Sequence, residues 1–262
     1  MEIGYLNNKV KETARNLEPG ILAVGYHNLL SGEEVLYNQT HVFPAASIVK
    51  ICILLEYERQ ITRGLIYRNK KIILQEKDIV GGAGILLEMH RGMELTLEDL
   101  MRLTIVISDN TASNVMLDQL GMDNINKFME SLGLKDTVIG RKFMIDPNAK
   151  FSKNFTSIRD MILLLKMLYK GEVLNEAGTK DALEIMSRQQ YREKIPLLLP
   201  NKLKIAHKTG EITGVRHDCA IVFYEKAPYI MCFLTEKMPD VVACDRQISL
   251  MSKEFYIESS KQ

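Results

Sequence analysis

The sequence predicts an α/β (α+β) fold, with helices flanking an antiparallel sheet of about five strands and an all-helical lobe inserted into this frame. Two β-rich runs lie near the N-terminus, three lie after Pro200, and the stretch between them is mostly helical in pattern. The β-rich runs cover residues 21–26, 34–37, 203–207, 219–224 and 229–235. Strands from both ends of the chain are therefore expected to share one sheet.

The N-terminal part is expected to form a helix and then a β-hairpin, whose turn at residues 28–33 is rich in Asn, Ser and Gly. From Ser47 onward the chain is apolar on nearly all sides at helical length, which is typical of a helix buried at the centre of the protein. Thr96-Leu97-Glu98-Asp99 is a helix N-cap signature. Further helices are expected at residues 111–120, 122–132 and 157–169.

After Pro200 the β-rich runs alternate with short breaks at residues 210–214 and 225–228, a pattern that predicts a β-meander. Residues 241–259 return to helical composition. The chain of 262 residues fits one compact body with two lobes. We expect a sheet lobe from residues 1–45 and 186–262, a helical lobe from residues 46–185, and an active site between the two lobes.

The charge balance argues against nucleic-acid and membrane-surface partners. The sequence contains 34 Lys and Arg against 33 Asp and Glu, a formal net charge of +1, with no basic cluster. Apolar runs such as residues 51–55 are far shorter than the roughly 20 residues of a membrane-spanning helix. We therefore expect a monomer that acts on a small molecule, with no nucleic acid and no membrane span.

Cofactor and metal motifs are not found either. Gly81-Gly82-Ala83-Gly84 lacks the third glycine of a dinucleotide-binding loop, and the sequence contains no His-Glu-x-x-His. The four cysteines are widely spaced, so we expect reduced, buried thiols rather than disulfides or a zinc ribbon. The first residues lack the cationic start and apolar stretch of a secretory signal, which as read predicts a cytoplasmic protein, or a secreted one if the N-terminus has been trimmed.

Three short motifs carry the functional prediction. They are Ser47-Ile48-Val49-Lys50, Ser108-Asp109-Asn110 and Lys208-Thr209-Gly210, and each pattern occurs once. A fixed tripeptide is expected by chance only roughly 0.03 times in a chain of this length at average composition. The motifs fall at a helix start, in a loop between helices and at the end of a β-rich run, which are places where side chains can meet in one cleft.

With these motifs in this order, the sequence resembles the penicillin-recognising serine enzymes, and most of all the class A β-lactamase family. The resemblance covers nearly the whole chain, including Phe43-Pro44-Ala45-Ala46 and Gly214-Val215-Arg216-His217-Asp218. It implies a serine β-lactamase/transpeptidase-like fold and an acyl-serine mechanism without a cofactor.

The motif residues suit these roles chemically. Ser47 and Lys50 are three residues apart on a helix, so the amine can reach the hydroxyl and act as its general base. A lysine serves as a base near pH 7 only if burial beside a second cation, here Lys208, lowers its pKa. Ser108 would pass the proton to the leaving nitrogen, and Asn110 would restrain Lys50 and bind the acylamide group of the substrate.

The resemblance implies that the backbone N–H groups of Ser47 and Glu211 form the oxyanion hole. It also implies that the Lys-Thr-Gly strand, through Thr209 and Gly210, binds the substrate together with a nearby arginine that holds a carboxylate. Arg216 is the expected arginine. The alternative is that Arg216 is a solvated hairpin residue paired with Asp218.

One loop departs from the family pattern. Phe143 stands where the family has the glutamate that activates the hydrolytic water, and Asn154 stands where it has an aspartate that pairs with the loop arginine. Asp146 and His217 are the alternative bases, whereas His207 should point away from Lys208 because side chains alternate along a strand. Acylation is expected to survive and deacylation to be slow.

Three functions remain open from the sequence. The first is a β-lactamase-like serine hydrolase that opens a β-lactam or a related amide through an acyl-serine. The second is a peptidase or esterase that uses the same serine on an acyl-D-Ala-like carboxylate. The third is a binding protein for penicillin or a cell-wall fragment that does not turn it over. The complete set of acylation motifs favours the enzymes, because a binding protein needs neither Lys50 nor Ser108.

Overall fold

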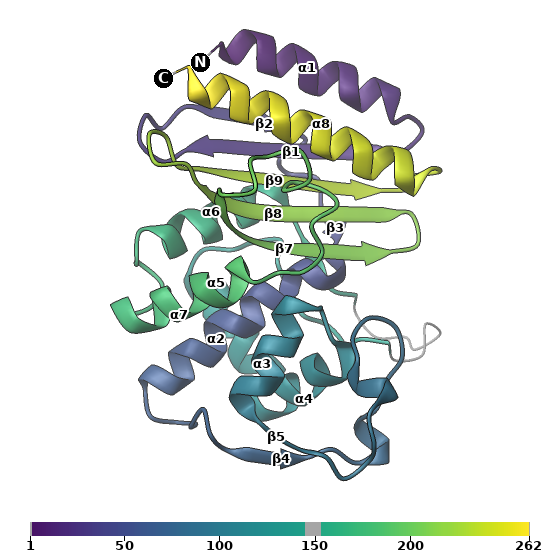
Figure 1. Ribbon diagram of the computed structural model, residues 1–262, viewed down its shortest axis with the longest axis vertical. Coiled ribbons are helices and arrows are strands. Elements are labelled where there is room, and N and C mark those ends of the chain that lie inside the picture. The colour runs from purple at the N-terminus through teal and green to yellow at the C-terminus, as the bar shows by residue number, and fades with distance from the viewer. Residues whose placement is uncertain (1, 145–152, 262) are drawn as a thin grey trace.

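A five-stranded antiparallel sheet forms the frame of the protein, as the sequence predicts (Figure 1). The computed structural model describes residues 2–144 and 153–261. The strands are β1 (Ile21–Asn28), β2 (Glu34–Tyr37), β7 (Lys204–Ile212), β8 (Val215–Phe223) and β9 (Tyr229–Glu236). Their order is β2-β1-β9-β8-β7, so the N-terminal hairpin pairs with the C-terminal meander through β1 and β9. The predicted sharing of one sheet by both chain ends is confirmed.

Helices cover both faces of this sheet. Two of them, α1 (Ile3–Asn16) and α8 (Val241–Ser260), lie on one face, where Leu22 and Val24 of β1 belong to their apolar cluster (Figure 1). On the other face, Ala23 joins a larger cluster with α6 (Ile158–Tyr169) and the central helix α2 (Lys50–Thr62). The alternation of neighbouring β1 residues between two apolar clusters is the strand periodicity that the sequence displays.

The remaining helices lie in the middle of the chain. They are α3 (Leu97–Val106), α4 (Asn110–Leu120), α5 (Met122–Ser131) and α7 (Glu176–Ser187), with 3-10 turns η1 (Ala46–Val49), η2 (Glu76–Asp78) and η3 (Leu86–Glu88). Two small sheets pair β3 (Phe43–Pro44) with β6 (Phe155–Thr156) and β4 (Lys71–Ile73) with β5 (Glu94–Thr96). The predicted cap of α3 is confirmed, because Thr96 and Asp99 exchange hydrogen bonds across its first turn.

Helix α2 is buried along almost its whole length, as its all-round apolar pattern predicts. Its buried acids Glu56 and Glu58 are paired with the arginines Arg59 and Arg68, at 2.6 Å in both cases. These ion pairs allow charged residues on a buried helix. The predicted helix start near Ser47 is a 3-10 turn, and regular α-helix begins at Lys50.

Strand β7 differs from the prediction. Its sequence pattern suggests a strand that ends at residue 207, yet it continues through Lys208-Thr209-Gly210 to Ile212. It pairs with β8 over its whole length, and the turn contains only residues 213 and 214, with Gly214 at a φ of +68°. The predicted break at residues 210–214 is too long, because backbone pairing with β8 keeps residues 210–212 in the strand.

All four cysteines are buried and free, as predicted. Across residues 2–144 and 153–261, we find no helix with the length and apolar character required to cross a membrane. The same described ranges contain no group of three His, Cys, Asp or Glu side chains placed to hold a metal ion. The division into a sheet lobe and a helical lobe stays a prediction.

Gly25 of β1 sets the distance between the sheet and α6. A Cβ atom added at Gly25 would lie 2.6 Å from Cγ2 of Ile158 and 2.8 Å from Cγ1 of Ile162. We predict that Gly25→Ala lowers the free energy of unfolding by about 1–3 kcal/mol, because this crowding is an overpacked core. Gly4→Ala in α1, where nothing lies within 4 Å, is the control and is expected to be neutral or stabilising by up to about 1 kcal/mol. Equal effects of the two substitutions in urea unfolding would contradict this packing account.

Candidate active site

Ser47 lies in the 3-10 turn η1, directly before α2, where β7 passes close to it. The preceding residue, Ala46, has a φ of +44°, a left-handed conformation that is rare for a residue with a side chain. At Gly210 of β7, an added Cβ would be 3.2 Å from the backbone nitrogen of Ser47 and 3.0 Å from Cγ1 of Ile48. Glycine is therefore needed at this position to bring the β7 backbone, and with it Glu211, alongside the serine.

Ser108 lies in the short connection between α3 and α4, with a φ of +56°. The next residue, Asp109, caps α4 by accepting a hydrogen bond from the backbone of Ala112 at 2.8 Å. Its other carboxylate oxygen accepts the backbone N–H groups of Ile85 and Leu86 at 2.7 and 2.9 Å. Asp109 therefore fixes two loops at the site, a role that the sequence reasoning missed although Asp is a common N-cap residue.

The hydroxyl of Ser108 connects the two motif lysines. Nζ of Lys50 donates to Oγ of Ser108 at 3.1 Å and to its backbone oxygen at 2.6 Å, and Nζ of Lys208 donates to the same Oγ at 3.0 Å. Both lysines are fully buried, and Ser108 is 4% exposed. Three residues from distant parts of the chain therefore form one hydrogen-bonded group, as their assigned roles require.

Burial changes the basicity of both amines. It lowers the pKa of Lys50 well below its ordinary value, and the neighbouring charge of Lys208 lowers it further. Burial also lowers the pKa of Lys208, to about 7, and the charge of Lys194 adds to this, although Asp218 opposes it. Lys50 is thus an amine that gives up its proton more readily than an ordinary lysine, which suits a general base.

Asn110 and Phe143 complete the surroundings of Lys50. The side-chain oxygen of Asn110 accepts from Nζ of Lys50 at 2.9 Å, so the predicted restraint is present. The ring of Phe143, which is 9% exposed, lies 4.5 Å from the same Nζ. Asn114 holds Phe143 through both of its backbone groups, at 2.8 and 2.9 Å. Phe143, which the resemblance aligns with the family's glutamate, is therefore held against the amine of Lys50.

The three motifs open onto one cavity of about 390 Å³. Its walls include Ser47 and Ser108, together with Thr209, which is 2% exposed. The remaining lining residues are Ala83, Tyr191, Glu193, Glu211 and Asp245. Residues from all three motifs thus face the same space, as the sequence predicts, and their roles as nucleophile, proton carrier and substrate-binding strand stay predictions.

Lys194 is a buried cation near this cavity that the sequence analysis missed. Its Nζ lies 2.7 Å from a carboxylate oxygen of Glu193 and 2.5 Å from one of Glu211, and both glutamates line the cavity. Burial tends to raise the pKa of Glu211, but the ion pair with Lys194 brings it below its ordinary value. No motif marks Lys194, because its role depends on a fold that brings residue 194 next to β7.

Arg216 lies against a wall of the cavity without being one of its lining residues. Its Nε lies 3.4 Å from Asp245, which lines the cavity, and its Nη1 donates to the backbone oxygen of Val215 at 2.9 Å. Its role in substrate binding stays a prediction. The alternative pairing with Asp218 is wrong, since Arg216 pairs with Asp245 and Asp218 contacts His207 at 3.0 Å. Lys194 and Arg216 thus each pair with a carboxylate that lines the cavity, Glu211 and Asp245.

The histidines do not supply a base at this site. His217 is buried, with Nε2 bonded to the backbone oxygen of Pro44 and Nδ1 accepting from the backbone of Thr235. Burial lowers the pKa of His217 to about 4. It is therefore wrong as a replacement for the loop glutamate. His207 bonds to Asp218 and not to Lys208, as predicted. The other alternative base, Asp146, lies outside the described residues.

Asn154 stabilises the start of the loop in a different way from an ion pair. Its side-chain oxygen accepts the backbone N–H groups of Gly140 and Arg141, at 2.9 and 3.0 Å. The neutral amide thus holds residues 140 and 141 through their backbone N–H groups and needs no charged partner.

Comparisons with known proteins agree with this geometry. A model of the beta-lactamase enzyme family matches residues 6–256. Beta-lactamase CARB-4 from Pseudomonas aeruginosa is 25% identical over 93% of this chain and 87% of its own. The structure of a beta-lactamase from Sphaerobacter thermophilus is 28% identical, with a TM-score of 0.94 over 100% of this chain and 99% of that one. A variant of PBP-A, solved as an acyl-enzyme complex with penicillin G, is 27% identical, with a TM-score of 0.90 over 99% and 97% of the two chains.

The low pKa of Lys208 predicts a pH-dependent stability. Between about pH 7 and pH 10 the unfolded chain holds a proton on this lysine that the folded protein has lost, so the free energy of unfolding should rise with pH. Lys208→Met should flatten this rise by up to about 1.4 kcal/mol per pH unit. Lys202→Met, at an exposed lysine just before β7, should keep the wild-type slope. Urea unfolding at several pH values measures this, and identical slopes for wild type and Lys208→Met would contradict the burial account.

Proposed function

Because the chain belongs to the beta-lactamase enzyme family, as a class A member, we propose that it opens a β-lactam or a related amide through an acyl-serine at Ser47, and that the acyl-enzyme hydrolyses slowly. The observation that carries this proposal is the hydrogen-bonded group of Lys50, Ser108 and Lys208, which faces the same cavity as Ser47.

In acylation, Oγ of Ser47 attacks the carbonyl carbon of the lactam while its proton passes to the neutral amine of Lys50. The C–N bond of the lactam then breaks, and its nitrogen takes a proton from the hydroxyl of Ser108. Oγ of Ser108 then regains a proton from Lys50 or Lys208, since the two amines donate to it at 3.1 and 3.0 Å. The proton is thus carried from nucleophile to leaving group without passing through solvent.

The negative charge on the carbonyl oxygen needs donors that are in place before the reaction. Ser47 is the second residue of η1, and the first N–H groups of a helical turn lack a partner within the helix. The close approach at Gly210 brings the backbone of Glu211 to the other side of the serine. The N–H groups of Ser47 and Glu211 are our proposed oxyanion hole.

The binding end of the site includes Thr209, whose side chain is almost fully buried and lines the cavity. Lys194 and Arg216 supply positive charge behind the cavity wall, where they pair with Glu211 and Asp245. A hydroxyl in a cavity flanked by cations suits a carboxylate or another polar group next to the lactam nitrogen.

Slow deacylation is supported by the position of Phe143. The ester of Ser47 is hydrolysed only when a water molecule is deprotonated close to it, and a phenyl ring cannot accept a proton. Here the ring lies 4.5 Å from Nζ of Lys50, and two hydrogen bonds from Asn114 hold its backbone. An apolar surface therefore stands at the position where the family's base would be.

We predict that Ser47→Ala and Lys50→Ala each abolish covalent labelling by benzylpenicillin, because nucleophile and base act as one unit and their losses do not add. Ser260→Ala and Lys202→Ala, at exposed positions, serve as controls and should label at the wild-type rate. Intact-protein mass spectrometry measures the adduct. Labelling of Ser47→Ala at the wild-type rate would mean that another residue is the nucleophile.

We also predict a burst of about one equivalent of opened benzylpenicillin per active site, followed by a slow steady state. Loss of a positioned base costs roughly 10²–10⁴ in rate, and here it affects deacylation alone. Phe143→Glu should speed the steady state and leave the burst in place. Phe143→Gln introduces a side chain of the same size as Glu that cannot act as a base, so its steady state should stay slow. Stopped-flow absorbance follows both phases. Turnover without a burst in the wild-type protein would contradict slow deacylation.

A further inference from the structure

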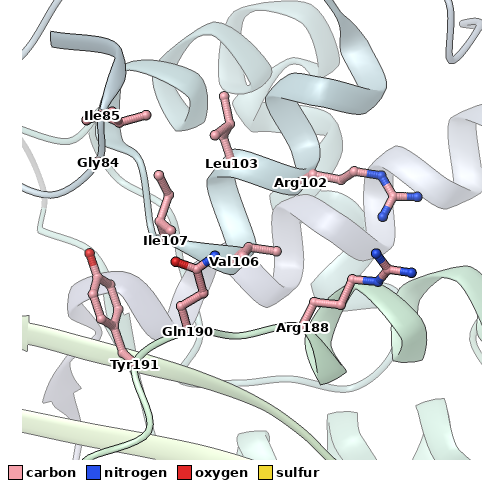
Figure 2. A pocket seen from close by; sticks show the side chains of 9 residues that line it. All are labelled: Gly84, Ile85, Arg102, Leu103, Val106, Ile107, Arg188, Gln190 and Tyr191. Atoms are coloured by element: carbon pink, nitrogen blue, oxygen red, sulfur yellow. The ribbon is translucent and has the colours of Figure 1, made fainter. Parts of the chain in front are cut away.

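A second pocket, of about 780 Å³, lies beside the candidate active site (Figure 2). The last turn of α3, the loop at Gly84 and Ile85, and the chain that follows α7 form its walls. Tyr191 lines both this pocket and the active-site cavity, and Ala83 of the cavity is followed directly by Gly84 of the pocket. The two spaces are therefore neighbours. We refer to the second one as the α3–α7 pocket.

The α3–α7 pocket lies on the side of the site from which a leaving group departs. Ile107, which lines the pocket, directly precedes Ser108, which lines the active-site cavity. In the function proposed above, Ser108 protonates the group that is expelled from the acyl carbon, so this group must lie next to Ser108. Any extension of it beyond Ser108 leads toward the α3–α7 pocket. This step rests on the proposed function.

The middle of the pocket is apolar. Ile85, Leu103, Val106 and Ile107 supply its aliphatic walls (Figure 2). Ile85 is 40% exposed, so part of its side chain is accessible to a ligand in the pocket. Such walls suit an aliphatic segment of a ligand.

One end of the pocket carries two positive charges. The side chains of Arg102 and Arg188 come from different walls, and Figure 2 shows both guanidinium groups at the end away from Tyr191. Each pairs with a glutamate one turn earlier in the chain, Glu98 at 2.7 Å and Glu184 at 2.6 Å, and neither glutamate lines the pocket.

These ion pairs leave donors free for a ligand. Arg102 uses Nε and Nη2 toward Glu98, and Arg188 uses Nη2 toward Glu184. Within the part of the chain that the structure describes, Nη1 of either arginine has no hydrogen-bond partner. Two guanidinium groups at one end of a pocket whose lining contains no carboxylate favour an anion, and their planar donors match a carboxylate.

We propose that the α3–α7 pocket is a leaving-group subsite, which binds the departing portion of the substrate as an aliphatic chain ending in a carboxylate. The apolar walls take the chain, and Arg102 and Arg188 take the carboxylate. This subsite is separate from the polar groups next to Ser47. It therefore selects among substrates by the structure of their leaving groups.

The test uses esters with one common acyl group and three leaving alcohols: ethanol, 8-hydroxyoctanamide and 8-hydroxyoctanoate. In wild type, the octanoate ester should acylate Ser47 at least about tenfold faster in kcat/KM than the octanamide ester. In Arg102→Gln/Arg188→Gln this preference should fall below about twofold. The ratio is measured within each protein, so a general loss of activity cancels. Equal rates in wild type, or an unchanged preference in the double variant, would overturn the proposal.

Arg159→Gln is the matched control. Arg159 is 41% exposed at its side chain and pairs with Asp136 at 2.8 Å, much like Arg102, which is 37% exposed, but it lies on α6 and outside the pocket. It should keep the wild-type preference for the octanoate ester. Loss of the preference in Arg159→Gln as well would show a general charge effect and would also overturn the proposal.

A binding measurement separates this proposal from the proposed function. Octanoate is titrated into Ser47→Ala, where no acylation takes place, and should bind at least about tenfold more weakly once Arg102 and Arg188 are replaced. Arginine-dependent octanoate binding together with no acylation by any ester or β-lactam would overturn the proposed function and support the pocket. No octanoate binding together with penicillin labelling of Ser47 would overturn the pocket alone.

Discussion

The burial of two lysines around one serine hydroxyl is the constraint on which the site depends. Lys50 and Lys208 are both fully buried and both donate to Oγ of Ser108, so two like charges would meet in a space that water does not screen. Burial and the second charge lower the pKa of Lys50, which favours its neutral form and suits it to act as a base. The burial that suits Lys50 to the role proposed above therefore also costs the folded protein electrostatic stability.

Several local features of the backbone hold this arrangement in place. Strained backbone occurs at Ala46 and Ser108, next to the reacting groups, where surrounding packing keeps it in place. Asp109 joins the loop at residues 85 and 86 to the start of α4, and Gly210 allows β7 to reach the serine. The result is an ordered site in which Lys50, Ser108 and Lys208 are hydrogen-bonded together and the ring of Phe143 lies against Lys50. In the function proposed above, these groups carry out acylation, and Phe143 is the reason to expect slow deacylation.

Much of this could be predicted from the sequence, because it depends on local pattern. Runs of β-forming residues marked the strands, the Thr96 cap marked α3, and the three motifs identified Ser47, Lys50, Ser108 and Lys208. What the sequence does not reveal depends on contacts between distant segments. Lys194 joins the site only because β7 lies next to it, and Arg216 pairs with Asp245 of α8 and not with Asp218 of its own hairpin. His217 looks like an available base in the sequence, yet two backbone groups occupy its ring nitrogens.

The most direct test of this account is the ionisation of Lys50, followed through the NMR shift of its Cε as pH is raised. In the wild-type protein, Lys50 should titrate well below the value of about 10.4 for a free lysine. In Lys208→Met its pKa should rise, because one of the two causes of the depression is gone, while burial keeps it below the free value. A Lys50 that titrates near 10.4 in the wild-type protein, or one whose pKa is unmoved by the loss of Lys208, would contradict the lysine pair as the source of the base.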